Sequence, residues 1–252
     1  MLAADRREEI LKKLAIEGSV IVSKLTREFD VSIETIRRDL ETLEKKGLLK
    51  RVHGGAVLKG NQSSKLHYAK RKDESIEEKR EIAQKAVSYI EEGSVIALNN
   101  STTNLEIAKE MKHHFNELTI ITNSLMITNE LAEKENFTII LLGGVLNSKE
   151  YSFDGQFTGD MLSNFVVHKS FLSMAGVSLS RGVTDYLMSE VHIQKKLIEI
   201  SQEVIVLVTS DNVDNESLVK IADIEEINLI ITDSKVNPDI IKKYSEYGVE
   251  II

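Results

Sequence analysis

The strongest constraint on the fold of this 252-residue chain is an alternation that begins near residue 74 and continues to its end. Short apolar runs, such as VIAL (95–98) and LTIIT (118–122), alternate with segments whose apolar residues recur at helical spacing. Such runs are typical of strands buried on both faces of a parallel sheet. The sequence therefore predicts an α/β domain with a mainly parallel sheet. The expected helices span 74–92, 104–111, 125–135, 189–201 and 238–247, and the expected strands span 95–98, 118–122, 137–142, 171–174, 204–209, 229–232 and 249–252.

Polar or glycine residues follow several of these expected strands. In a parallel sheet, ligands bind outside the carboxyl ends of the strands, and a helix that begins there offers free N–H groups to phosphate or carboxylate. Each cluster alone is ordinary turn and cap chemistry, but several clusters on one edge of one sheet favour a binding site for an effector. The candidate effector-binding residues are Asn99, Asn100, Ser101, Thr102, Thr103, Asn123, Gly143, Gly144 and Asn212.

Three helices are predicted near the N-terminus, over 6–17, 24–29 and 33–46. Ser23 and Ser32 are the expected N-caps of the second and third helices. A short helix, a brief turn and an amphipathic helix form a helix-turn-helix. The core face of the third helix is expected to consist of Ile33, Ile36, Leu40 and Leu43.

The third helix would place polar and basic side chains in the major groove of DNA. Arg37 and Arg38 can bind phosphate or guanine, and Thr35 can bind a phosphate or a base edge. Strands at 48–52 and 56–58 would form a wing around a His53-Gly54-Gly55 turn, whose glycines permit close approach to a phosphate backbone. The candidate DNA-binding residues are Ser32, Glu34, Thr35, Arg37, Arg38, Arg51, His53 and Gly54.

The formal net charge of −8 hides an asymmetry along the chain. Residues 1–72 carry a net charge of +7, and the remaining residues carry −15. A small basic segment joined to a larger acidic one indicates a polyanion-binding module attached to a separate body. We therefore expect a DNA-binding domain at 1–58, a polar linker at 59–73 and a sensing and oligomerisation domain at 74–252.

The segment VSIETIRRDLETLEKKGLLKRVHGGAV (31–57) resembles the DNA-binding signature of the DeoR family of bacterial transcriptional regulators. The resemblance implies a winged helix-turn-helix whose second helix contacts the operator. It continues through TNSL (122–125) and LLGG (141–144), with Phe171, Gly176 and Gly182 also in frame. It implies a sensor domain similar to ribose-5-phosphate isomerase that binds a phosphorylated sugar or related metabolite, and it adds Glu190 to the candidate effector-binding residues.

Three positions depart from the family pattern. Asn99 and Ser101 stand where the family usually has Asp and Gly, and Asn212 stands where it often has Lys. These changes remove a carboxylate that could fix sugar hydroxyls and a cation that could hold phosphate. Either the ligand differs or the pocket is degenerate; His168, Lys169 or Arg181 could supply positive charge instead.

The expected function is a ligand-controlled repressor that binds double-stranded operator DNA as a homodimer or higher homo-oligomer. One alternative is a domain that serves oligomerisation only. Another is an isomerase-like enzyme, for which Asp185 and Glu190 remain as carboxylates. No catalytic residue, metal or cofactor is expected, since cysteine is absent and no histidines have metal-ligand spacing. The chain lacks an apolar signal core or a membrane-length apolar run, so a cytoplasmic location is expected.

Overall fold

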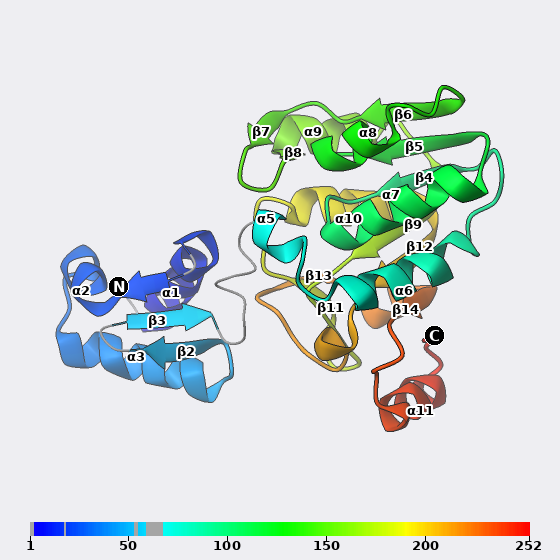
Figure 1. The fold of residues 1–252 in the computed structure, drawn as a ribbon. Helices are drawn as coiled ribbons and strands as arrows, with labels where there is room; N and C mark the ends of the chain where they lie inside the picture. The colour runs from blue at the N-terminus through cyan, green and yellow to red at the C-terminus, as the bar shows by residue number, and fades with distance from the viewer. Residues whose placement is uncertain (1–2, 18, 53–54, 59–67) are drawn as a thin grey trace. The chain divides into compact units, whose positions relative to one another are not determined.

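The computed structural model describes residues 3–17, 19–52, 55–58 and 68–252, which form two compact units (Figure 1). The N-terminal unit comprises Met1–Arg71 with Tyr186–Met188, and the C-terminal unit comprises Lys72–Asp185 with Ser189–Ile252. Two predicted DNA-binding residues, His53 and Gly54, and residues 59–67 of the predicted linker lie outside the described residues. Within the described ranges, no helix has both the length and the apolar character needed to cross a bilayer.

The N-terminal unit contains the predicted helix-turn-helix and the strand pair of the wing. Its strand β3 lies between β1 and β2 and is antiparallel to both. The last residues of the predicted linker form a short helix, α5 (Tyr68–Arg71). The other elements are α1 (Ala3–Glu17), β1 (Ser19–Ile21), α2 (Val22–Phe29), α3 (Ile33–Lys45), β2 (Leu49–Val52) and β3 (Gly55–Leu58).

Two local expectations for this unit are wrong. Ser23 is not the N-cap of α2, because the helix begins at Val22, two residues before its predicted start, and Ile21 occupies the cap position. Gly55 lies in strand β3 rather than in the turn. A Cβ at Gly55 would overlap the carbonyl oxygen of Val20 in β1, so glycine is required there for strand contact.

A buried ion pair joins the first and third helices. Arg6 of α1 donates from Nε to Asp39 Oδ2 of α3 at 2.6 Å, and both side chains are buried. Ile10 and Leu14 of α1 and Leu40 of α3 belong to the surrounding apolar core. The pair therefore fixes α3 against α1 from within the core of the unit.

The C-terminal unit is built around a six-stranded sheet of order β14-β12-β9-β4-β5-β6, and all its strand pairs are parallel. This confirms the predicted α/β class. The strands are β4 (Val95–Leu98), β5 (Leu118–Thr122), β6 (Phe137–Leu141), β9 (Val167–Ser173), β12 (Ser201–Leu207) and β14 (Leu229–Ile231).

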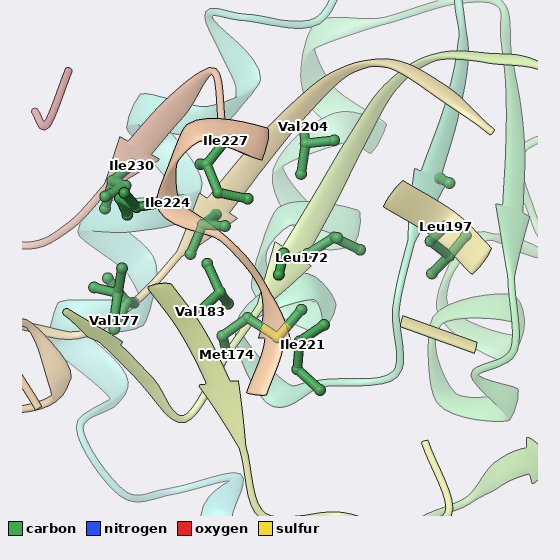
Figure 2. Close-up of a cluster of buried hydrophobic side chains, with 14 of the residues drawn as sticks. Leu172, Met174, Val177, Val183, Leu197, Val204, Ile221, Ile224, Ile227 and Ile230 are labelled. Carbon is green, nitrogen blue, oxygen red and sulfur yellow. The ribbon is translucent and has the colours of Figure 1, made fainter. Parts of the chain in front are cut away.

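Helices and a smaller sheet cover the two faces of this sheet. Side chains alternate along β4, so that Ile96 and Leu98 pack into one apolar cluster and Ala97 packs into the other. The first cluster includes residues of α6 (Ile76–Val87), α7 (Thr102–His114) and α8 (Leu125–Leu131). The second cluster, shown in Figure 2, includes residues of α9 (Gln156–Leu162), α10 (Val191–Glu199), α11 (Pro238–Tyr247) and the antiparallel sheet of β10 (Gly176–Ser178), β11 (Gly182–Asp185) and β13 (Val219–Ala222).

Several element boundaries differ from those predicted. Strands β9 and β12 begin four and three residues before the predicted starts, because polar residues such as Lys169 and Glu203 occupy their first positions and interrupt the apolar pattern. Residues 249–252 do not form a full strand and make one bridge to β14, at Ile251. The apolar pattern of the sequence does not reveal α9, the small antiparallel sheet or the hairpin of β7 (Val145–Asn147) and β8 (Ser152–Asp154), since the helix has seven residues and each strand only three or four.

Candidate functional site

The exposed surface of α3 carries most of the predicted DNA-binding residues. Ser32 is the N-cap, as predicted: its Oγ accepts from the Thr35 backbone N–H at 3.2 Å and lies 2.9 Å from the Thr35 hydroxyl. Glu34, Arg37 and Arg38 are exposed, and neither arginine has an ion pair among the described residues. The start of α3 therefore presents two uncommitted guanidinium groups beside a fixed hydroxyl pair.

Ile33 does not belong to the core face to which the sequence analysis assigned it. Ile36, Leu40 and Leu43 are buried as predicted, but Ile33 is 46% exposed at the first position of the helix. Helix ends leave their first residues with fewer neighbours, so the spacing pattern alone could not exclude Ile33 from the core. An apolar side chain at this place can contact a thymine methyl group.

Arg51 connects the wing to α3. Its backbone N–H donates to Glu44 Oε1 at 2.8 Å, and its Nε donates to Glu44 Oε2 at 2.7 Å. These hydrogen bonds, from the backbone first and then the side chain, lower the pKa of Glu44. Arg51 therefore has a positioning contact that the sequence analysis did not foresee.

In the C-terminal unit, Asn99 joins the carboxyl ends of two strands. Its Oδ1 accepts from the Ser173 backbone N–H at 2.9 Å, and its Nδ2 donates to the Ser173 carbonyl at 3.1 Å. Asn104 Nδ2 also donates to Asn99 Oδ1, at 2.8 Å. An amide can accept from one backbone group and donate to another, whereas an ionised carboxylate cannot donate. Asn at this position thus holds β4 to β9.

Ser101 is the N-cap of α7, where its Oγ accepts from the Asn104 backbone N–H at 2.9 Å. Its φ of −161° is extended backbone that any residue adopts, so Ser in place of Gly introduces no strain. The next two residues, Thr102 and Thr103, are buried in the first helical turn. Their backbone N–H groups occupy the positions that α-helices leave without an intrahelical acceptor.

Asn100 is the centre of a buried polar network. Its backbone N–H donates to Asn123 Oδ1 at 2.9 Å, and its Nδ2 donates at 3.2 Å to both the Glu150 carbonyl and Glu190 Oε1. The structure therefore brings together three of the predicted effector-binding residues, Asn100, Asn123 and Glu190. It adds Glu150, which the sequence analysis missed because it lies in an unpredicted loop.

A second buried pair lies along α10, which Glu190 caps. Gln194 Nε2 donates to Asp185 Oδ2 at 2.7 Å, and the Gln194 backbone N–H donates to the Glu190 carbonyl. The amide oxygens Asn100 Oδ1 and Gln194 Oε1 are buried and have no hydrogen-bond donor within the described ranges. A buried acceptor without a donor is costly, so the network has acceptor capacity for a ligand that supplies hydroxyl donors.

The remaining predicted effector residues serve other contacts. Gly143 accepts at its carbonyl from Thr158 Oγ1 at 2.8 Å, and a Cβ at Gly144 would overlap the same hydroxyl. The missing side chain of Gly144 thus allows α9 to approach the turn after β6. Asn212 lies in a 3-10 turn (Ser210–Asn212), where its Nδ2 donates to Thr209 Oγ1 at 3.2 Å.

The three alternative cations lie away from this edge of the sheet. His168 and Lys169 are near the amino-terminal end of β9, where His168 Nδ1 accepts from the Val95 N–H and Lys169 pairs with Glu203. Arg181, in the turn between β10 and β11, is exposed and pairs with Glu216. In the part of the chain that the structure describes, no cluster of three or more His, Asp or Glu residues is arranged to hold a metal ion.

Two family models match the chain. The model of the DeoR-like helix-turn-helix domain matches residues 6–62, and the model of the DeoR C terminal sensor domain matches residues 74–234. Together these matches cover both units.

Similar proteins are bacterial transcriptional regulators. The uncharacterized HTH-type transcriptional regulator YulB of Bacillus subtilis is 36% identical, with 100% of this chain and 96% of the relative covered. The lactose phosphotransferase system repressor of Staphylococcus epidermidis is 35% identical, with 98% of each covered. The glycerol-3-phosphate regulon repressor of Escherichia coli is 30% identical, with 100% and 99% covered.

Among solved structures, the chain is similar to ribose 5-phosphate isomerase A of Methanocaldococcus jannaschii. The identity is 15%, the TM-score is 0.39, and 54% of this chain and 53% of the isomerase are covered. A D-ribose-5-phosphate isomerase in complex with phospho-erythronic acid matches at 16% identity and a TM-score of 0.41, with 55% of each chain covered.

Proposed function

The chain belongs to the DeoR family of transcriptional regulators, and on that premise we propose that it is a cytoplasmic repressor of carbohydrate-metabolism genes. It binds operator DNA as a homodimer or higher homo-oligomer, and a phosphorylated sugar or related metabolite in the C-terminal unit releases it. The observation that carries the proposal is that Arg37 and Arg38 are exposed, with no ion pair in the described part of the chain, near the start of a helix whose opposite face is packed. Carbohydrate metabolism as the class of regulated genes is supported by relatives that are named as repressors of the lactose phosphotransferase system and of the glycerol-3-phosphate regulon.

DNA binding is tested with a duplex that the full-length protein selects from random sequences. Arg38→Ala should weaken binding by about tenfold and, if Arg38 contacts a phosphate, should reduce the slope of log affinity against log salt by about 0.9. Lys45→Ala is the matched control, because Lys45 is exposed at the far end of the same helix and pairs with Glu41. Unchanged affinity and slope in Arg38→Ala would refute the assignment of α3 as the DNA-contacting helix.

The effector site proposed here combines the start of α7 with the Asn100 network. A phosphate would accept hydrogen bonds from the backbone N–H groups of Thr102 and Thr103. Hydroxyls of the sugar would donate to Asn100 Oδ1 and Gln194 Oε1, which have no donor among the residues that the structure describes. The orientation of the Asn100 amide supports this, because its Nδ2 already faces two acceptors.

A thermal-shift screen of sugar phosphates against their unphosphorylated analogues tests this site. A ligand at 100 times its Kd stabilises the folded protein by about 2.7 kcal/mol, which raises Tm by several degrees. Asn100→Ala should abolish the shift relative to its own unliganded Tm, whereas Asn164→Ala, which removes an exposed amide, should retain it. If no compound shifts Tm, the C-terminal unit would be better explained as an oligomerisation domain only. If the wild type isomerises a sugar phosphate and Glu190→Gln abolishes this activity, the protein would be an enzyme.

A short segment offers a route from this site to the DNA-binding module. Residues Tyr186–Met188 belong to the N-terminal compact unit, where Arg71 Nη1 donates to the Tyr186 hydroxyl at 2.5 Å. The same segment directly follows Asp185 and ends two residues before Glu190, and both of these carboxylates lie in the buried network. We expect Tyr186→Phe to keep operator affinity but to weaken release by the effector; full release by the same effector concentration would refute this route.

A further inference from the structure

Exposed apolar side chains are concentrated in one short stretch of the C-terminal unit. Six of the ten large hydrophobic side chains that are exposed in the described residues lie between 145 and 166. Four of them define what we call the apolar patch: Val145, Leu146, Phe157 and Met161, with exposed fractions of 69%, 47%, 78% and 38%. Single exposed apolar residues are ordinary, but a group of them marks an interaction surface.

The four side chains come from neighbouring elements. Strand β7, which carries Val145 and Leu146, pairs with β8, and α9 begins two residues after β8 (Figure 1). A Cβ at Gly143, just before β7, would lie 4.0 Å from Met161 Sδ. Phe157 and Met161 are four residues apart on α9 and therefore share a face. Side chains alternate along a strand, so Val145 and Leu146 extend from opposite faces of the hairpin, and the patch comprises this hairpin and the neighbouring helix α9. Both follow β6, the last strand of the six-stranded sheet.

The charge distribution indicates what can cover this patch. Residues 73–252 carry a net charge of −15, so two copies of this unit repel each other over most of their surfaces. The thirty residues 137–166 contain only four charged side chains, of which Glu150 and Asp154 are buried. The other two, Lys149 and Asp160, are exposed and opposite in sign.

We propose that the apolar patch is the surface through which a second copy of this chain docks. In a two-fold symmetric contact the same surface meets itself, so a patch without net charge avoids the repulsion between the acidic units. Lys149 of each copy can then approach Asp160 of the other at the rim. The inference rests on the proposed function, because a single helix-turn-helix contacts too few bases and operator binding requires a second copy.

Light scattering and sedimentation of the full-length chain test the patch. Phe157→Lys should raise the dimer dissociation constant by at least about 30-fold, the effect of losing an aromatic residue that dominates an interface. Val145→Lys should act in the same direction. Tyr247→Lys is the matched control, because it adds the same charge at another exposed aromatic residue, on α11, and should leave the assembly unchanged. Equal circular dichroism spectra of the variants would show that the fold is retained.

The outcomes separate this inference from the proposed function. A monomeric wild-type chain, or a dimer that persists in both patch variants, would overturn the docking surface, whatever DNA the protein binds. Dissociation of the patch variants, with the control still dimeric, would support the docking surface. Failure of the wild type to select any DNA sequence would refute the proposed function and would leave that support unchanged. If both proposals hold, Phe157→Lys should still bind a single half-site but should lose tight binding to a site with two.

Discussion

The N-terminal unit carries most of its proposed DNA-binding side chains on the exposed surface of one helix, whereas the C-terminal unit holds most of its candidate residues inside a hydrogen-bonded network. Arg37 and Arg38 are exposed and have no ion pair among the described residues. Asn99 and Asn100 are buried, and nearly every polar atom that they carry bonds to the protein. In the first unit, a polar side chain that is not needed for packing is available to a ligand. In the second, the polar side chains that build the fold are the ones proposed for the effector site.

The buried charges of the N-terminal unit offer the largest test of this contrast. Arg6→Ala should destabilise the unit by up to about 3–5 kcal/mol, because the buried Asp39 would lose its 2.6 Å hydrogen-bonded partner and keep only the 3.9 Å ion pair with Arg7. Urea unfolding of the full chain, with hydrogen exchange at the amides of α1 and α3, would measure the loss. Lys12→Ala removes only exposed pairs with Glu8 and Glu9 and should leave the exchange unchanged. Equal exchange in both variants would show that the fold of this unit does not depend on its buried ion pair.

The Asn99 contact tests the structural role of the network in the C-terminal unit. Asn99→Ala should cost about 2–3 kcal/mol, because the backbone N–H and carbonyl of Ser173 would both lose a hydrogen bond. Asn99→Asp keeps the acceptor and loses the donor, so its cost should be smaller. Calorimetric unfolding of the unliganded protein measures both. Wild-type stability in Asn99→Ala would mean that this residue is free to serve a ligand instead.

A pH-dependent prediction concerns the core of the C-terminal unit. Burial, and next the nearby charge of Asp214, raise the pKa of Tyr244, whose hydroxyl donates to the Val177 carbonyl at 3.1 Å. Because the unfolded chain loses this proton near its ordinary pKa and the folded chain does not, stability falls as pH rises above about 10, by up to about 1.4 kcal/mol per pH unit. Denaturant unfolding between pH 8 and 11 should show this decline in the wild type. Tyr244→Phe should show less of it, and identical declines would contradict the assignment.

The sequence predicts the class of both units because periodicity and caps are local signals. Val95–Leu98 and the cap at Ser32 fall where apolar spacing and side-chain chemistry place them. The spacing of apolar residues predicts Ile33 in the core because it identifies which face of a helix is apolar. It does not show how far along that face the neighbouring elements extend, and Ile33 lies beyond them. The short strands near Val145 and Gly176 have no period long enough to detect.

The site in the C-terminal unit was harder to predict for a different reason. The sequence places Asn99, Asn100 and Asn123 at one edge of the sheet, but it does not say which amide holds a strand and which is available to the proposed effector. That distinction depends on Ser173 and Glu190, which are 74 and 90 residues away from their respective partners. Contacts at such separation leave no pattern in a single sequence.

The order of strands in the large sheet has a consequence for how the protein is made. Strand β4 pairs with β9, so that Ile96 meets Lys169, and the sheet also requires β12, which ends at Leu207. The strand pairs and apolar core of the DNA-binding module, in contrast, lie within its first 58 residues. Local contacts form faster than distant ones, and domains fold from the N-terminus as the ribosome releases them. We therefore expect each newly synthesised chain to acquire the fold of its helix-turn-helix module while the C-terminal unit is still unfolded.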